Sequence, residues 1–261
     1  VFLIQPTCAP VNDNLMELMI MVDACKRASA RQITAVLPYY GYARADRKTA
    51  GRESITAKLT ANLLVKSGVD RVLAMDLHSA QIQGYFDIPC DHIYGSPVLV
   101  NYLAKQKLGE IVVVSPDVGG VARARAFAKQ MKDAPLAIID KRRSAHNVSK
   151  SLTVIGDVKG KTAILIDDMI DTGGTICAGA ELLRKEGADR VIACASHAVF
   201  SPPAFERLSL EGLFEQVIVT NSIPVKNKES FQQLKVLSVA NMLGEAIWRI
   251  HEESSISSMF R

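Results

Sequence analysis

Short apolar runs recur along the chain, and each is followed by a loop and then by a segment with apolar residues at helical spacing, such as AGAELLRKEGA. The runs lack strict polar and apolar alternation, which is typical of strands covered on both faces. Strands and helices that alternate in this way favour parallel sheets with right-handed crossovers. The runs are ITAVLPYY, RVLAMDL, EIVVVSP, LAIID, TAILIDD, RVIACAS, QVIVT and LKVLSV.

The pattern falls into two similar halves, because LAMDLHS and LIDDMID each place an acidic loop after an apolar run. We therefore predict an α/β fold of two related domains, residues 1–95 and 96–240, divided near YGSP. Residues 241–261 should form a helix and tail that pack back on the first domain. Apolar spacing in this segment predicts that Met242 and Trp248 belong to the core.

The chain opens on VFLIQPT, with neither an initiating Met nor a polar lead-in. This stretch is typical of the middle of a strand. We expect the first domain to be incomplete at its start, so any targeting peptide would lie outside this sequence.

Composition excludes some function classes. The 261 residues are 48% hydrophobic and 22% charged, with a formal charge of +4, and no apolar run is long enough to span a membrane. Without a basic tail or a basic patch interleaved with aromatic residues, nucleic-acid binding is disfavoured. The five cysteines form no CxxC pair and have no His at zinc-ligand spacing, which indicates buried free thiols in a reducing compartment.

The stretch LIDDMIDTGGTICAG has the composition of an anion-binding loop. A strand is expected over 164–166 and a helix from Ile176, so the segment between them lies where open α/β sheets bind ligands. Gly173 and Gly174 let successive N–H groups converge at the start of the helix, and the hydroxyls of Thr172 and Thr175 add donors. This arrangement suits a phosphate.

Two acids, Asp167 and Asp168, precede the turn, and the P-loop spacing with its Lys is absent. Carboxylates repel a phosphate unless they hold another part of the same molecule. Vicinal sugar hydroxyls donate hydrogen bonds to carboxylates, so the pattern predicts a ribose 5-phosphate site. The alternative is a helix start capped by Asp171 or Thr172, with the other acids solvated.

The stretch DDMIDTGGT resembles the phosphoribosyl-binding loop shared by type I phosphoribosyltransferases and ribose-phosphate pyrophosphokinases. Further segments resemble the latter family, in particular its class I plant and cyanobacterial members, nearly from Val1 to Arg261. They are CAPVNDNLMELMIMVDACKRASA, PYYGYARADRK, MDLHSAQIQGYFDIP, VVVSPDVGGVARARAFAK and IIDKRR. The resemblance implies two type I phosphoribosyltransferase-like domains.

The same resemblance implies that ATP and ribose 5-phosphate give AMP and phosphoribosyl pyrophosphate, for nucleotide and amino-acid biosynthesis. Pyrophosphoryl transfer gathers negative charge, so Mg²⁺ and fixed cations should matter more than covalent catalysis. The residues implied for ATP binding are Arg44, Asp46, Arg47 and His78. Those implied for ribose 5-phosphate binding are Asp167, Asp168, Asp171, Thr172, Gly173, Gly174 and Thr175. Those implied for the metal are Asp76, His78, Asp87, Asp91 and Asp117.

Residue patterns alone leave some of these roles open. If the strand ran on to His78, Asp76 and His78 would project to the same side, whereas Asp87 and Asp91 could equally be solvated loop acids. Charge alone would make YARADRKTAGR, with Arg44, Arg47, Lys48 and Arg52, a solvated loop. The family commonly has Gln where this chain has Ala45.

Just past the run LAIID, Lys141 and Arg143 match the family's mobile catalytic loop and are implied to stabilise the transferring group, with His78 also catalytic. Arg142, between them, is expected to face solvent. Asp117, Val118, Gly119 and Gly120 resemble the pyrophosphate loop, at a second strand-loop-helix junction. His92, His146, His197 and His251 share no ligand spacing and should be structural or exposed.

The resemblance also implies a homo-oligomer, a hexamer or dimer, located in the plastid stroma or cytoplasm. A phosphate-activated, ADP-inhibited site at a subunit interface would involve Ser29, Arg52, Ser255, Ser257 and Phe260.

Two rival functions stay open. A phosphoribosyltransferase would need only the phosphoribosyl loop and would leave RADRK and DLH unexplained. A non-catalytic homologue that regulates an active partner tends to lose catalytic positions, yet Asp76, His78, Lys141, Arg143 and Asp171 are all present.

Overall fold

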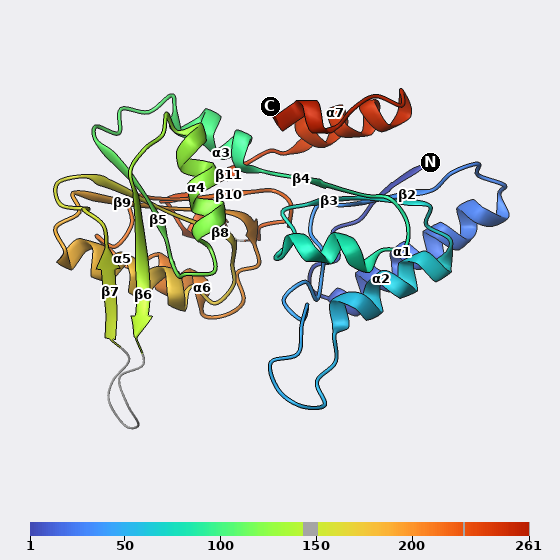
Figure 1. Ribbon diagram of the computed structural model, residues 1–261, viewed down its shortest axis with the longest axis horizontal. Helices are drawn as coiled ribbons and strands as arrows, with labels where there is room; N and C mark the ends of the chain where they lie inside the picture. The colour runs from blue at the N-terminus through green and yellow to red at the C-terminus, as the bar shows by residue number, and fades with distance from the viewer. Residues whose placement is uncertain (143–150, 227, 261) are drawn as a thin grey trace. The chain divides into compact units, whose positions relative to one another are not determined.

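The structure is a computed structural model, and it describes residues 1–142, 151–226 and 228–260. The chain divides into two compact units, Val1–Gly95 together with Ala240–Arg261, and Ser96–Val239. Each unit contains one sheet with helices packed against it (Figure 1). The terminal segment therefore belongs to the first unit.

In the first unit, a parallel sheet of four strands has the order β1-β2-β3-β4. The elements are β1 (Phe2–Ile4), α1 (Val11–Arg27), β2 (Thr34–Leu37), α2 (Thr56–Ser67), β3 (Arg71–Met75), the 3₁₀ helix η1 (Ala80–Tyr85), β4 (Cys90–Ile93), α7 (Ala240–His251) and the 3₁₀ helix η3 (Ser257–Phe260). Helices α1 and α2 cover one side of the sheet, where Leu18 and Leu64 are fully buried, and α7 lies on the other side (Figure 1).

In the second unit, a sheet of seven strands has the order β11-β10-β9-β8-β5-β6-β7. The elements are α3 (Ser96–Leu103), β5 (Ile111–Ser115), α4 (Val121–Gln130), β6 (Leu136–Arg142), β7 (Ser151–Ile155), β8 (Thr162–Ile170), α5 (Gly174–Lys185), β9 (Arg190–Ala198), α6 (Ala204–Leu208), β10 (Gln216–Thr220), the 3₁₀ helix η2 (Lys228–Ser230) and β11 (Leu234–Leu237). Only β7 among these strands is antiparallel to its neighbour, and β6 and β7 form a two-stranded arm (Figure 1).

This unit has three layers, because strand residues alternate between two buried faces. Val113 packs in the cluster with Phe127 of α4, whereas Val112 and Val114 pack in the cluster with Ile176 of α5. Covering both faces explains why these strands are apolar without alternation.

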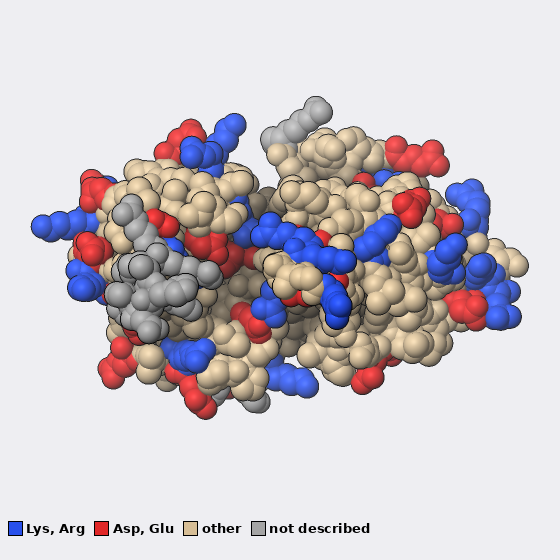
Figure 2. Space-filling model, turned by 60° about the horizontal axis from the view of Figure 1, so that its bottom comes forward, with Lys and Arg blue, Asp and Glu red and all other residues tan. Residues whose placement is uncertain are grey.

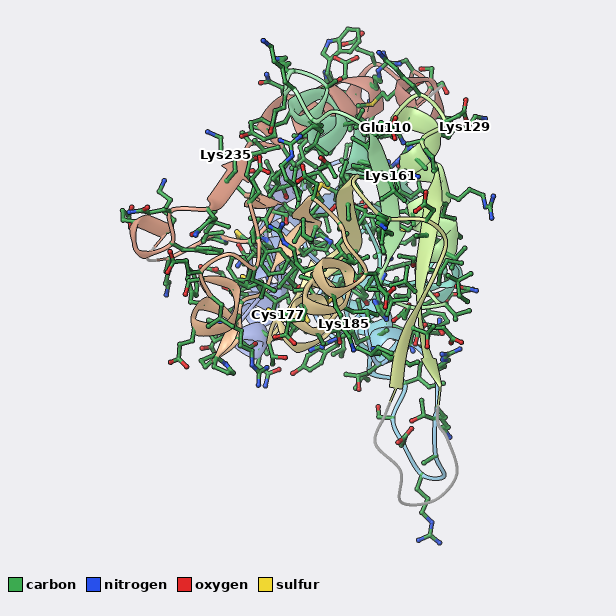
Figure 3. The ribbon with its side chains drawn as sticks, turned by 90° about the vertical axis from the view of Figure 1, so that its left-hand side faces the viewer. Glu110, Lys129, Lys161, Cys177, Lys185 and Lys235 are labelled. Atoms are coloured by element: carbon green, nitrogen blue, oxygen red, sulfur yellow. The ribbon has the colours of Figure 1, made fainter. Side chains whose placement is uncertain are left out.

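The order in which the chain adds strands to this sheet reverses between β5 and β8, although the two strands are parallel. From β5 the chain continues outward to β6, whereas from β8 it continues to β9, β10 and β11 on the other side. Glu110 and Lys161 precede these two strands and lie at one edge of the sheet (Figure 3), where Thr162 N–H donates to the Glu110 carbonyl at 2.8 Å. The carboxyl ends of β5 and β8 therefore share the opposite edge, and a switch point of this kind is where doubly wound sheets bind ligands.

The eight predicted strand runs are all strands, β2, β3, β5, β6, β8, β9, β10 and β11, and the predicted α/β class is confirmed. The expectation that Trp248 is a core residue is wrong: its exposed fraction is 55%, and the buried positions of α7 are Leu243, Ala246 and Ile250. Met242 is half-buried. The buried face of α7 is therefore narrower than its apolar spacing predicts.

The cysteines are all free, but only Cys177 and Cys194 are buried, while Cys8, Cys25 and Cys90 are half-buried. The prediction of five buried thiols is therefore wrong for three of them. Even so, burial raises the pKa of the Cys90 thiol to about 12 and that of the Cys177 thiol to about 11. Within the described residues, no helix is both long enough and apolar enough to cross a membrane.

We expect the core of the second unit to be sensitive to volume loss on β9. Ile192 is fully buried, so Ile192→Ala should lower the free energy of unfolding by about 2–5 kcal/mol, because it removes buried methylene groups and leaves a cavity. The matched control is Ile155→Ala on β7, where the side chain is 52% exposed, and its cost should stay below about 1 kcal/mol. Denaturant midpoints measure both, and equal losses would contradict this assignment of the core.

Candidate functional site

The acidic pair lies within a strand. Strand β8 runs on to Ile170, so Asp167 and Asp168 are part of it and do not follow its end, as a strand over 164–166 had predicted. Pairing with β9 continues past both acids, from Asp167 with Ala195 to Ile170 with Ala198. The backbone of the pair is thereby fixed by the sheet ladder rather than by a loop.

One arginine holds both carboxylates. Arg123, on α4, places Nη1 at 3.1 Å from Oδ1 of Asp167 and at 3.4 Å from Oδ1 of Asp168. Asp168 has an exposed side-chain fraction of only 3%, and Asp167 has 26%. Burial, together with the negative charge of Asp168, raises the pKa of Asp167 despite Arg123. The pair is therefore a crowded negative site that one cation only partly neutralises.

A tight turn follows the strand and leads into α5. Gly173 has a φ of 76°, in the left-handed region that favours glycine, and it is the N-cap residue of the helix. The N-cap position is thus held by Gly173, and not by Asp171 or Thr172 as the alternative had it.

The helix start leaves amides available for a ligand. Cys177 N–H donates the first helical bond, to the Gly173 carbonyl at 2.9 Å, so the preceding amides of Gly174, Thr175 and Ile176 have no acceptor within the helix. These amides carry the positive end of the dipole of a helix that spans twelve residues. The geometry suits a phosphate or another anion.

The second strand-loop-helix junction lies beside the first, because β5 pairs directly with β8. Its turn is held from within: Gly120 N–H donates to Oδ1 of Asp117 at 2.9 Å, and Ser115 Oγ donates to the Asp117 carbonyl at 2.6 Å. A Cβ on Gly120 would lie 2.9 Å from Ser115 Oγ, so the turn has no room for a side chain at that position. The two predicted ligand loops thus flank the switch point.

In the first unit, the acid and histidine after β3 do not have the predicted geometry. The strand ends at Met75, and Asp76 has a φ of 41°, so strand alternation does not extend to His78. Asp76 is tied to the end of β4, because its Oδ2 accepts from Gly95 N–H at 2.7 Å. His78 is exposed.

Two of the predicted metal residues are engaged by cations. Asp91 pairs with Arg71 at 2.6 Å, and Asp87 lies 3.5 Å from Lys58 Nζ. Within the described residues, no group of three or more His, Cys, Asp or Glu side chains could hold a metal ion by itself. Asp87 is exposed, as a solvated loop acid would be, whereas Asp91 is half-buried within β4 and is therefore not a loop acid.

The cationic loop has a defined internal structure. The Glu53 carboxylate accepts hydrogen bonds from Thr49 N–H at 2.7 Å and from Ala50 N–H at 3.0 Å. These bonds lower the pKa of Glu53. The Asp46 carbonyl accepts from the Tyr85 hydroxyl, so the loop is also anchored to η1. Its basic side chains, Arg44, Arg47, Lys48 and Arg52, are exposed.

Lys141 lies within β6, where it pairs with Leu152 of β7, and not beyond the strand as predicted. Its side chain is exposed. Arg143 and His146 lie outside the described residues, as does the side chain of Arg142.

The other histidines have the structural or exposed character that was predicted. His92 Nε2 accepts from Leu77 N–H at 3.0 Å, and buried His197 has Nδ1 at 2.9 Å from Ser222 Oγ. His251 is exposed in the last turn of α7.

Sequence reasoning missed Arg123. It stands six residues after Asp117 in VVVSPDVGGVARARAFAK, among other basic residues that have the same local appearance. Only the pairing of β5 with β8 brings the following helix α4 to the acidic pair. An Arg in the first turns of a helix after a glycine-rich loop was the available signal.

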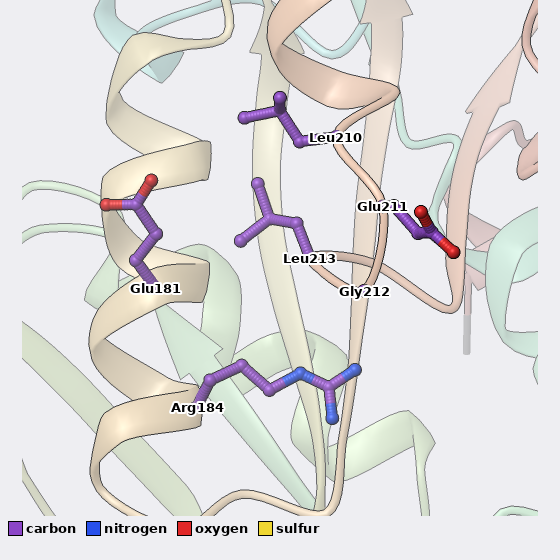
Figure 4. Close-up of a pocket in the computed structure, with 6 residues that line it drawn as sticks. All are labelled: Glu181, Arg184, Leu210, Glu211, Gly212 and Leu213. Atoms are coloured by element: carbon purple, nitrogen blue, oxygen red, sulfur yellow. The ribbon is translucent and has the colours of Figure 1, made fainter.

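A separate open pocket of about 450 Å³ lies between α5 and the segment before β10 (Figure 4). Its lining contains none of the predicted site residues: it consists of Glu181, Arg184, Leu210, Glu211, Gly212 and Leu213. Acidic and basic side chains are interspersed on the face of the molecule in Figure 2, so no single sign of charge dominates it.

Family models match two parts of the chain: residues 1–68 match the N-terminal domain of ribose phosphate pyrophosphokinase, and residues 143–261 match the phosphoribosyl synthetase-associated domain. Ribose-phosphate pyrophosphokinases of Prochlorococcus marinus and Synechococcus elongatus are 88% and 77% identical over all of this chain, which covers 79% of each relative.

Among solved structures, the phosphoribosylpyrophosphate synthetase from Mycobacterium smegmatis is 48% identical with a TM-score of 0.90, over 97% of this chain and 83% of that one. The resemblance indicated by the sequence motifs is confirmed.

We expect the acidic pair to reduce stability at neutral pH. An acid whose pKa is raised on folding stabilises the folded state below its unfolded-state pKa, and this contribution is lost as the pH rises through the folded-state pKa. Asp167→Asn removes that loss, so the stability of the variant relative to the parent should rise by on the order of 1 kcal/mol between about pH 5 and pH 8.

Thermal or denaturant midpoints across this pH range measure the difference. The control is Glu186→Gln, at the exposed C-cap of α5, for which the difference should not change with pH. A pH-independent difference for Asp167→Asn would contradict a raised pKa of Asp167 in the folded protein.

Proposed function

The chain belongs to the ribose-phosphate pyrophosphokinases, and from this membership we propose how its own residues perform the reaction. It is a diphosphotransferase that transfers the pyrophosphoryl group of ATP to the C1 hydroxyl of ribose 5-phosphate, giving phosphoribosyl pyrophosphate and AMP. The product serves nucleotide and amino-acid biosynthesis.

Ribose 5-phosphate binds at the end of β8. The observation that supports this most directly is the helix start after Gly173, whose first amides have no acceptor within the helix, close to the acidic pair. The amides of Gly174 and Thr175, with the hydroxyls of Thr172 and Thr175, receive the 5-phosphate. The carboxylates of Asp167 and Asp168, both of which contact Arg123, accept hydrogen bonds from the ribose diol.

Asp171 completes the ribose 5-phosphate set between the acids and the glycines. The turn from Asp117 to Gly120 receives the pyrophosphoryl group at the neighbouring strand end, next to the sugar. Arg123 is freed from the acidic pair to the extent that the diol replaces it, and its charge then stabilises the negative charge that develops in the transfer.

The nucleotide binds in the first unit. Arg44 and Arg47 pair with ATP phosphates from a loop whose fold is held by Glu53, and Asp46 and His78 add polar contacts. Lys141 and Arg143 are cations for the transferring group, and Lys141 is carried on the exposed arm of β6. Every role here is positioning or charge stabilisation, because phosphoryl transfer requires little covalent chemistry from the protein.

The predicted site residues include carboxylates, which are the type of protein ligand that Mg²⁺ prefers. This ion usually takes one or two carboxylates and completes its shell with water and substrate phosphates, so the lack of a larger acidic cluster in the described chain is no obstacle. Asp76 is the carboxylate that we assign to it in the first unit and Asp117 in the second. When bound, the ion neutralises phosphate charge. We leave out Asp87 and Asp91, whose carboxylates pair with Lys58 and Arg71.

We propose a homo-oligomer as the functional form. Apolar side chains are exposed on both helices of one face of the first unit, Met16 and Ile20 on α1 and Leu59 and Leu63 on α2, by 41% to 62%. Exposed apolar groups on adjacent helices are typical of protein interfaces. Ser29, Arg52, Ser255, Ser257 and Phe260 would then form a phosphate-responsive site, and the plastid stroma or cytoplasm would supply the substrates.

The activity test is AMP release. The protein should release AMP only when ATP, Mg²⁺ and ribose 5-phosphate are all present. Asp168→Asn combined with Thr175→Val should lower kcat/KM for ribose 5-phosphate by about 100-fold, because the site loses one charged and one neutral hydrogen-bonding group. The control pairs Glu186→Gln with Ser209→Ala, both exposed in the same unit.

Other results would favour the rival functions. Consumption of phosphoribosyl pyrophosphate with a nucleobase would support a phosphoribosyltransferase. Absence of AMP release from the protein alone, with stimulation of an active relative, would support a regulator. Unchanged affinity for the sugar in the double variant would contradict the assignment of the pocket.

The oligomer prediction concerns α1 and α2. Ile20→Asp with Leu59→Asp should shift the protein to smaller species in sedimentation, because two charges would be buried at the interface. Leu210→Asp, at a residue of the second unit that is 52% exposed, should leave the assembly unchanged. A parent protein that sediments as a monomer at micromolar concentration would refute the proposal.

A further inference from the structure

Helix α6 packs directly behind the phosphate-binding turn. A Cβ built on Gly173 would lie 3.5 Å from Leu208 Cγ and 3.7 Å from both the Cα and the carbonyl oxygen of Ala204. Ala204 and Leu208 are buried, so this side of the turn is closed to solvent by the helix. The turn is therefore supported from outside as well as by its own backbone.

The same helix places a cation on the turn. Arg207 Nη1 donates to the Thr172 carbonyl at 3.1 Å and lies 3.2 Å from the position of a Cβ on Gly174. The guanidinium thus lies against both residues that flank Gly173. Arg207 is exposed, and its neighbour Glu206 is exposed as well.

The hydrogen bond sets the direction of a peptide group. In a trans peptide, the carbonyl and the following N–H point in opposite directions. Because the Thr172 carbonyl points to Arg207, the N–H of Gly173 points away from α6. That N–H therefore joins the amides of Gly174 and Thr175 as a donor on the side open to a ligand. Without the arginine, the peptide could turn its carbonyl oxygen toward the phosphate and repel it.

We propose that Arg207 is a positioning residue for the 5-phosphate of the sugar substrate, acting through the Thr172–Gly173 peptide; this inference rests on the proposed function. The positive charge of the guanidinium further favours an anion in the turn. The effect should be confined to the sugar, because Arg207 contacts the sugar-binding turn.

Arg207→Ala should raise KM for ribose 5-phosphate about fivefold to tenfold, the size expected for one charge-assisted hydrogen bond that acts on the turn. KM for ATP and kcat should stay within about twofold of the parent. Arg207→Lys retains a positive donor and should recover part of the loss. Glu206→Ala, on the same helix, is the matched control and should leave all three parameters unchanged.

Binding of ribose 5-phosphate by titration calorimetry, well below the thermal midpoint of each variant, gives a second measurement that does not depend on turnover. A weaker dissociation constant for Arg207→Ala, with an unchanged one for Glu206→Ala, supports the proposal. Equal changes in KM for both substrates, or no change in KM for the sugar, would overturn it and leave Arg207 a surface contact of α6.

The two proposals fail in different ways. If the parent protein releases no AMP in response to ribose 5-phosphate, the proposed function is wrong. If the parent is active and Arg207→Ala binds the sugar as the parent does, only the role of Arg207 is wrong.

Discussion

Two carboxylates fixed side by side at the end of a buried strand constrain the whole second unit. The sheet ladder on β8 continues past Asp167 and Asp168, so neither side chain can move away by a change in the backbone. Burial and the charge of Asp168 raise the pKa of Asp167, and Arg123 is a cation that contacts both carboxylates. Crowded carboxylates of this kind generally cost stability, and such costs are common at functional sites.

The sheet topology explains why this arrangement is possible. The strand order reverses between β5 and β8, and at their carboxyl ends each of these two strands leads into one glycine-containing turn. Helix α4 follows the first turn and carries Arg123 back to the acids of the second strand. The helix after each turn lies on a different face of the sheet, α4 on one and α5 on the other, so the two helix starts do not compete for space.

Much of the fold could be predicted, because parallel strands that are covered on both faces appear in the sequence as continuous apolar runs. Two strands that were not predicted have no such apolar run. Strand β4 (Cys90–Ile93) contains an Asp and a His, and β7 (Ser151–Ile155) is the antiparallel edge strand of its sheet. The position of Asp76 could not be predicted either, since its left-handed backbone depends on ties to Ile93 and Gly95. Local patterns carry no information on such contacts.

The same limit applies inside the site. The stretch DDMIDTGGT predicted the acids and the glycines, because they lie close together in one segment of the chain. Arg123 contacts Asp167 from 44 residues away along the chain, and Arg207 contacts Thr172 from 35 residues away. Each looks like an ordinary surface arginine in its own segment. The sequence motif therefore defines what the site can bind. The distant arginines add contacts that the motif does not encode: Arg123 with the two carboxylates and Arg207 with the Thr172 carbonyl.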